Sequence, residues 1–311
     1  MKTAIVIIDM QNDFIHKNGS LRVPNGDKAA KNIANFLKEN DVDKIFVSRD
    51  YHPKNNIAST EFWYDSENKH VEPFTEITLD DVLSKKVRAH YYKSYLIAYL
   101  KELEKKGKKL IAWPPHCVEN TWGSEICNEL KEVLENKDNV EYIKKGTNPY
   151  TEHYSIFKAE IPLAGYSVAD GCIYAPYILE TTNIPTIGNI SEEILSKKVE
   201  GDFYAPVEFK NETNDTTLNT ELLDKLDTYD KIYICGVATD FCVKESIKDI
   251  VTYKPETCKK MVILKDCMAS IGDISLENDE VYTKAIELGA IIDAWNYSLL
   301  LKNKQIFYKI F

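Results

Sequence analysis

The chain has 311 residues, a formal net charge of −10, 44% hydrophobic residues and 28% charged residues. This composition is ordinary for a globular protein with a substantial core. The negative charge disfavours nonspecific binding to nucleic acids and docking on anionic membranes. Seven cysteines without a C-x-x-C pair indicate neither a disulfide framework nor a cysteine zinc knuckle. The apolar N-terminal run is too short for a signal peptide or a membrane span, so we predict a cytoplasmic protein.

Short apolar runs alternate with amphipathic stretches along most of the chain. The runs that predict strands lie at 3–8, 44–48, 109–112, 140–143, 232–237, 261–264 and 290–294. Helical spacing of apolar residues predicts helices at about 27–39, 95–106, 124–136, 218–227, 240–252 and 277–288. This alternation predicts an α/β fold, with a doubly wound, mostly parallel sheet and helices on both faces. Functional residues should then gather at the carboxyl ends of the strands.

Two long segments, at about 53–108 and 159–217, interrupt this rhythm. Long irregular segments within a compact domain are usually functional lids or appendages. We predict a single domain over 1–311 that carries these two insertions, which form a lid beside the pocket or a contact in a homo-oligomer.

The first two predicted strands each end in an acidic residue. Asp9 is the first charge after the apolar run, where it could be an active-site acid or could simply cap the loop. Asp50 and His52 are two residues apart, so in an extended chain both side chains project from one face. His116, which follows two prolines, is a candidate third ligand for a metal ion. The histidines outside these motifs suit surface positions better; they are 16, 70, 90 and 153.

Two further candidates follow later strands. Lys144 and Lys145 come after the fourth strand, where one lysine can face the catalytic edge, although a pair of solvated lysines is the usual outcome. Cys242 lies in the first turn of a helix that leaves the strand at 232–237, with Thr239 or Asp240 as the expected N-cap. The helix N-terminus would lower the pKa of the Cys242 thiol, and its free N–H groups could hold an oxyanion. A small apolar residue packed under a helix is the alternative for Cys242.

Five motifs, in this order along the chain, resemble the nicotinamidase branch of the isochorismatase-like cysteine hydrolases. They are IVIIDMQNDF, SRDYHP, WPPHCVENTWGSEI, KKGTNPYTEHYSIF and KIYICGVATDFCV. The resemblance implies the isochorismatase-like hydrolase fold, and it implies hydrolysis of nicotinamide to nicotinate and ammonia, a reaction of NAD salvage. Many relatives carry another histidine shortly after the D-x-H pair, where this chain has Asn56.

The resemblance also implies a role for each matching residue. The catalytic triad would be Asp9, Lys145 and Cys242, and the N–H groups of Ala238 and Cys242 would form an oxyanion hole after a cis peptide at 237–238. One divalent metal ion would be bound by Asp50, His52 and His116. Zinc is the expected ion, and manganese or iron would also tolerate these ligands. The aromatic residues Phe14, Trp113 and Tyr154 would line the pyridine pocket.

Three other functions are alternatives to nicotinamide hydrolysis. A related amidase acting on another heterocyclic carboxamide would use the same residues. A catalytically silent metal-binding interaction protein is a second alternative, but retention of Asp9, Lys145 and Cys242 together argues against it. A cysteine phosphatase needs an arginine six residues after its cysteine to bind phosphate. This chain has Lys248 at that position, so we reject this alternative.

Overall fold

The computed structural model describes residues 1–89, 93–164, 168–169, 172–173, 177–178 and 216–294. Its centre is a six-stranded sheet in the order β14-β13-β12-β1-β2-β7, in which every neighbouring pair is parallel. The strands are β1 (Thr3–Ile8), β2 (Lys44–Asp50), β7 (Val140–Lys145), β12 (Lys231–Val237), β13 (Met261–Ala269) and β14 (Ile291–Asp293). The prediction of a doubly wound parallel sheet is therefore confirmed.

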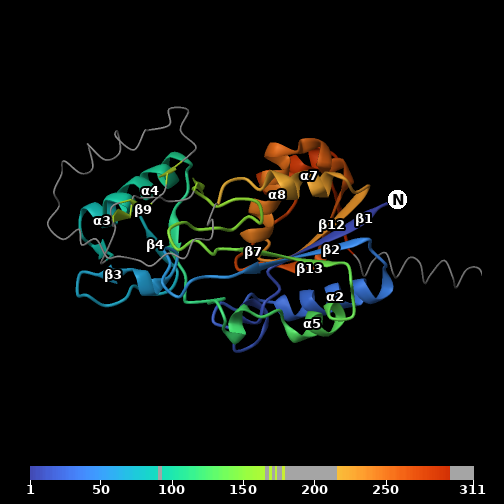
Figure 1. Ribbon diagram of the computed structural model, residues 1–311, viewed down its shortest axis with the longest axis horizontal. Helices are drawn as coiled ribbons and strands as arrows, with labels where there is room; N and C mark the ends of the chain where they lie inside the picture. The colour runs from blue at the N-terminus through green and yellow to red at the C-terminus, as the bar shows by residue number, and fades with distance from the viewer. Residues whose placement is uncertain (90–92, 165–167, 170–171, 174–176, 179–215, 295–311) are drawn as a thin grey trace, which may run out of the picture.

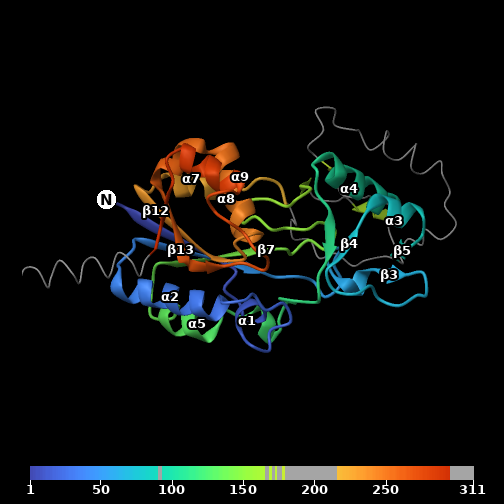
Figure 2. The same cartoon turned by 180° about the vertical axis from the view of Figure 1, so that it is seen from behind.

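Helices cover both faces of this sheet. In Figure 1, α2 (Gly26–Glu39) and α5 (Asn128–Leu134) lie below it, whereas α7 (Thr220–Asp227) and α8 (Cys242–Tyr253) lie above. Figure 2 shows α9 (Glu280–Glu287) on the same side as α8. Because both faces are covered, the central strand β1 is buried along nearly its whole length, which accounts for its continuous apolar sequence.

The strand order reverses between β1 and β12. From β1 the chain adds β2 and β7 on one side, and it later returns to place β12 on the other side of β1. In sheets of this kind, ligands bind beside the carboxyl ends of the strands at such a switch point. Asp9 follows β1, and Cys242 follows β12, so the two candidate residues flank the switch point.

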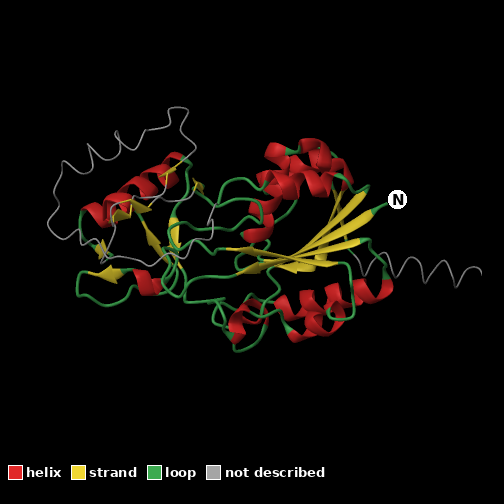
Figure 3. Cartoon of the chain, in the orientation of Figure 1, coloured by secondary structure: helices red, strands yellow, loops and turns green. Residues whose placement is uncertain are grey.

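A second group of elements lies beside the main sheet (Figure 3). It contains two small antiparallel pairs, β3–β5 and β4–β6. Its members are η1 (Thr60–Phe62), β3 (Tyr64–Asp65), β4 (Thr75–Ile77), α3 (Leu79–Leu83), β5 (Val87–Arg88), α4 (Lys93–Lys105) and β6 (Leu110–Ala112). The strand predicted at 109–112 exists as β6, but its place in the parallel sheet is wrong, because it pairs with β4 instead.

Short elements complete the described chain. They are α1 (Asn12–Ile15), η2 (Trp122–Ser124), η3 (Pro255–Lys260), and the antiparallel pairs β8 (Leu163–Ala164) with β11 (Tyr177–Ile178) and β9 (Val168–Ala169) with β10 (Cys172–Ile173). Most of the second predicted insertion, 159–217, lies outside the described residues. None of the described helices is both long and apolar enough to cross a bilayer.

The helix predicted at 124–136 is shorter than expected and begins only at Asn128. The preceding residues are extended, because Asn12 N–H donates to the Glu125 carbonyl and Cys127 N–H donates to the Met10 carbonyl, at 2.9 Å each. These bonds fasten the segment to the end of β1. These two hydrogen bonds to the motif IVIIDMQNDF therefore take the place of the first predicted turn of the helix.

Candidate active site and metal centre

Lys145 lies at the centre of the candidate site. Its Nζ is 2.9 Å from Asp9 Oδ2, 3.1 Å from Asp50 Oδ1 and 3.6 Å from Cys242 Sγ. All four residues are buried. Lys145 is the last residue of β7, and Asp50, its register partner, is the last residue of the neighbouring β2. Adjacent parallel strands therefore bring the lysine to the two carboxylates.

The two lysines after Ile143 take different environments. Lys145 is among the largest fully buried side chains, whereas Lys144 is exposed and lies 4.3 Å from the centre of the Tyr51 ring. Burial alone would lower the pKa of Lys145, but the Asp50 and Asp9 carboxylates raise it well above its usual value. The ammonium is therefore charged, and it balances the buried acids.

Asp9 is held in place from several sides. It follows β1 with a positive φ of 52°, and its carboxylate accepts a hydrogen bond from Ser48 Oγ at 2.6 Å. Burial raises the pKa of Asp9, while Lys145 opposes that rise. A carboxylate with a raised pKa is a better proton acceptor than an exposed aspartate, so Asp9 is suited to general base chemistry.

Cys242 is the first residue of α8, and its Sγ and the Asp9 carboxylate both contact Lys145 Nζ. The prediction of a lowered thiol pKa is wrong. Burial raises the pKa of Cys242 well above its usual value, Lys145 opposes this, and the charges of Asp9 and Asp50 add to it. The resting sulfur is therefore a thiol that needs a base, and Asp9 is the acid beside it.

The loop before Cys242 also differs from its prediction. Phe241 is the N-cap residue, and Asp240 instead accepts hydrogen bonds from the N–H groups of Ile271 and Gly272, at 3.1 and 2.7 Å. The peptide between Val237 and Ala238 is cis, as the resemblance implies. Among the hydrogen bonds of the described loops and caps, none is donated by the N–H of Ala238 or of Cys242.

Asp50, His52 and His116 form a compact cluster next to Lys145. One potential ligand atom from each lies within 4.8 Å of the others, and all three residues are buried. The Nε2 atoms of His52 and His116 are 3.1 and 3.7 Å from Asp50 Oδ2. The cluster is therefore a candidate metal centre with two nitrogen ligands and one oxygen ligand.

The surroundings of this cluster fit a metal ion. His52 Nδ1 is 3.1 Å from the Gly146 carbonyl, and His116 Nδ1 is 2.8 Å from the Pro114 carbonyl. Each contact directs the other ring nitrogen, Nε2, towards Asp50, as outer-shell partners do in metal sites. Gly146 has φ +70°, and a Cβ there would come within 2.6 Å of His52.

The predicted aromatic residues contact either the candidate metal ligand His116 or the residue before Cys242. Phe14 is 5.4 Å from the His116 ring, and Trp113 Nε1 donates to Tyr154 Oη at 3.1 Å. Phe241 was not identified from the sequence; its ring lies 5.1 Å from that of Trp113 and 5.4 Å from that of Tyr154. Its position directly before Cys242 was the available signal.

Two further residues of the site were not identified from the sequence. Phe74, which lies within the first predicted insertion, packs at 5.7 Å against the Trp113 ring and is 54% exposed. His153 was assigned to the surface, which is wrong, because its carbonyl accepts from Lys145 Nζ at 3.0 Å and its Nε2 is buried. Burial and the charge of Lys145 lower the pKa of His153 to about 3.

A model of the isochorismatase domain matches residues 3–156, about half of the chain. This chain belongs to the isochorismatase family. The match contains Asp9, Lys145 and the three candidate metal ligands, whereas Cys242 follows later in the chain.

Among curated relatives, the chain is 31% identical over 159 residues to a nicotinamidase of Saccharomyces cerevisiae, and 28% identical over 158 residues to a nicotinamidase of Escherichia coli. Each alignment includes 50% of this chain, and it spans 62% of the yeast protein and 56% of the bacterial one. The chain thus matches somewhat more than half the length of these relatives.

Solved structures show the same fold over a greater length. The yeast nicotinamidase bound to the inhibitor nicotinaldehyde has a TM-score of 0.55 and 21% identity, covering 94% of this chain and 99% of the other. An Acinetobacter baumanii nicotinamidase has a TM-score of 0.51 and 18% identity, covering 94% and 96%. Both similarities confirm the isochorismatase-like fold.

Proposed function

We propose that this chain is a nicotinamidase, which hydrolyses nicotinamide to nicotinate and ammonia. The observation that carries this proposal is the position of Lys145, whose Nζ contacts both the Asp9–Cys242 pair and the candidate metal ligand Asp50. A nucleophile and its base therefore lie next to a site that can hold a heterocycle through a metal ion. The curated relatives are nicotinamidases, which supports this substrate over other carboxamides.

In the proposed reaction, Asp9 takes the proton of the Cys242 thiol, and Lys145 stabilises the negative charge shared between them. The sulfur then attacks the carboxamide carbon, while the N–H groups of Ala238 and Cys242 hold the oxyanion. Asp9 returns its proton to the leaving nitrogen, so that ammonia departs and a thioester remains. Water, activated by Asp9, cleaves the thioester, which releases nicotinate and restores the thiol.

Asp50, His52 and His116 would hold one divalent ion. Zinc is the proposed ion, and these ligands also suit manganese or iron. When bound, the ion supplies a Lewis-acid contact that can position the pyridine ring. Phe14, Trp113 and Tyr154 are the proposed walls for the ring. A role in NAD salvage and a cytoplasmic location remain predictions, as does a homo-oligomer.

An ammonia-release assay tests the proposal. Nicotinamide should be turned over faster than pyrazinamide, and both faster than aliphatic amides. Cys242→Ala should abolish turnover, whereas Cys258→Ala should retain it, because Cys258 lies in η3, after the C-terminal end of α8, and Cys242 is the first residue of that helix. Turnover that survives in Cys242→Ala would contradict the thioester mechanism. Faster release from another amide would assign the chain to a different carboxamide.

A further inference from the structure

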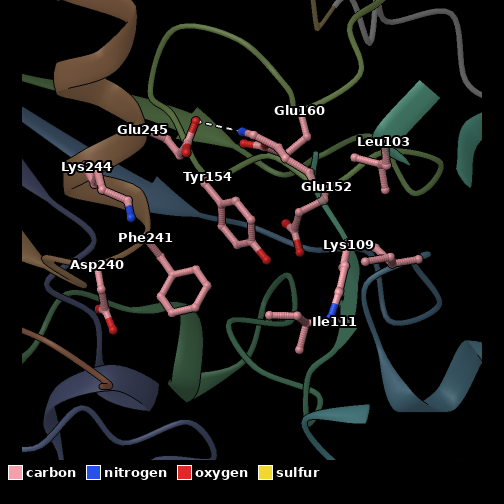
Figure 4. A pocket seen from close by; sticks show the side chains of 12 residues that line it. Leu103, Lys109, Ile111, Glu152, Tyr154, Glu160, Asp240, Phe241, Lys244 and Glu245 are labelled. Atoms are coloured by element: carbon pink, nitrogen blue, oxygen red, sulfur yellow. Dashed lines mark hydrogen bonds and ion pairs between the residues drawn. The ribbon is translucent and has the colours of Figure 1, made fainter. Parts of the chain in front are cut away.

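A cavity of about 180 Å³ is lined in part by two of the aromatic residues described above (Figure 4). Tyr154 and Phe241 form one wall, and the aliphatic residues Leu103, Leu110 and Ile111 contribute other parts of the lining. Neither the candidate catalytic triad nor the candidate metal ligands line this cavity. The cavity is therefore distinct from those two groups of residues, although it is also lined by Tyr154, a proposed wall of the pyridine pocket.

Most charged groups that line the cavity already have partners. Lys108 forms ion pairs with Glu160 and with Glu245, the latter at 2.8 Å. The remaining paired groups are Lys109 with Glu76 at 2.5 Å, Lys244 with Asp279 at 3.4 Å, and Asp240 with the backbone N–H groups of Ile271 and Gly272. These pairs leave one lining carboxylate to account for, that of Glu152.

Glu152 presents an unsatisfied oxygen. The residue is only 5% exposed, and its Oε1 accepts a hydrogen bond from His153 N–H at 2.8 Å. Its Oε2 is buried and has no hydrogen-bond partner. In Figure 4 the carboxylate points into the cavity, near the hydroxyl end of Tyr154. A buried carboxylate oxygen without a partner is costly unless a cation or a donor satisfies it.

We propose that this cavity binds a small organic cation of the alkylammonium class. The Glu152 carboxylate would receive the positive charge, and the rings of Tyr154 and Phe241 would add cation–π attraction. The aliphatic residues would contact the alkyl groups. The volume is below the roughly 300–1,000 Å³ of pockets for drug-sized ligands, so the ligand is small.

Other ligand classes fit less well. Hard metal ions such as Ca²⁺ require about six or more oxygen ligands, whereas the aliphatic and aromatic wall supplies few. An anion would be repelled by Glu152. A neutral apolar molecule would leave Oε2 of Glu152 unsatisfied. Of these classes, only the alkylammonium ions satisfy both the charge of Glu152 and the apolar lining.

Titration calorimetry on the full chain, with tetramethylammonium chloride as the probe, tests this site without relying on turnover. At constant ionic strength we expect saturable binding of one tetramethylammonium per chain, and none of the neutral, similarly shaped tert-butyl alcohol. Glu152→Gln should weaken binding about tenfold or more, the typical effect of losing a contact to a charged group. Glu129→Gln, which removes the same charge from the exposed surface of α5, should bind as the wild type does.

A second variant tests the cavity without changing its charge. Ile111→Trp places a larger side chain in the lining and should also abolish binding, even if Glu152→Gln fails to fold. Circular dichroism would establish that each variant tested is folded. The proposal is overturned if the wild type shows no saturable binding, if tert-butyl alcohol binds equally well, or if folded Ile111→Trp retains the wild-type affinity. Unchanged affinity in folded Glu152→Gln would overturn it as well.

Discussion

Replacing Lys145 tests the electrostatics of the candidate site. Its Nζ lies about 3 Å from one oxygen of Asp9 and from one oxygen of Asp50. With an effective dielectric constant of about 20, the Coulomb attraction between the ammonium and each carboxylate is roughly 5 kcal/mol, before the cost of burying the ammonium is subtracted. Removing the ammonium while both carboxylates stay buried should cost about 3–5 kcal/mol net. We therefore expect Lys145→Met to lose that much stability at pH 8, together with all detectable turnover.

The double variant Lys145→Met/Asp9→Asn separates charge from packing. It removes one of the two unpaired carboxylates, so it should regain at least half of the lost stability while remaining inactive. Urea unfolding with a chelator present would measure both effects without a contribution from bound metal. Lys144→Met is the matched control, and it should cost less than about 1 kcal/mol because Lys144 is exposed.

Either of two results would refute this reasoning. The first is a Lys145→Met variant as stable as the wild type, which would mean that the carboxylates do not need the ammonium. The second is a double variant less stable than Lys145→Met, which would mean that packing or hydrogen bonding dominates at Asp9.

Three further predictions concern the candidate metal centre and the stability of α8. Gly146→Ala should abolish metal binding and turnover, because the new Cβ would meet His52 at 2.6 Å and Asp50 at 2.7 Å. Gly107→Ala, at a similar φ of +66° in open space, should cost only about 1–2 kcal/mol and keep full metal content by elemental analysis. Dialysis against a chelator should abolish the release of ammonia from nicotinamide, and added Zn²⁺ should restore it. Undiminished activity in the metal-free protein would contradict the proposed role of the ion. Burial raises the pKa of Asp249 to about 6, so the folded state holds that proton more tightly and loses stability as the pH rises from about 4 to 6. Asp249→Asn should therefore be about 2–3 kcal/mol more stable than the wild type at pH 8. The difference in the free energy of unfolding, measured with urea, should shrink towards pH 4.5. A difference that stays constant from pH 8 to pH 4.5 would contradict the raised pKa of Asp249.

The sequence predicts the parallel sheet well because its strands are buried on both faces. Such strands have continuous apolar sequences, and the polar residues that follow each apolar run indicate where the strand ends. Asp9 directly follows its run, and Asp50 and Lys145 each lie two residues beyond theirs. Because the carboxyl ends of parallel strands share one edge, the sequence also predicts that these residues lie close together.

The errors arise where a distant contact decides the local structure. Residues 109–112 are apolar enough for a central strand, but β6 pairs with β4, which no local pattern indicates. Residues 125–127 have a helical pattern, but backbone bonds to the end of β1 hold them extended. The pKa of Cys242 depends on burial and on the nearby acids more than on its helix position. Each of these outcomes depends on the assembled fold.

The candidate metal centre and the candidate catalytic residues are not independent, because Asp50 contacts both His52 and Lys145. Its Oδ1 is 3.1 Å from Lys145 Nζ, while its Oδ2 is 3.1 Å from His52 Nε2. His52 and Lys145 overcome the effect of burial and lower the pKa of Asp50 well below its usual value, so this carboxylate is charged. Its negative charge raises the pKa of the Cys242 thiol. A positive charge at the Asp50 Oδ2 side would reduce that effect and leave Lys145 to stabilise the thiolate. Substitutions of the metal ligands should therefore alter the reactivity of Cys242 as well as the binding of substrate.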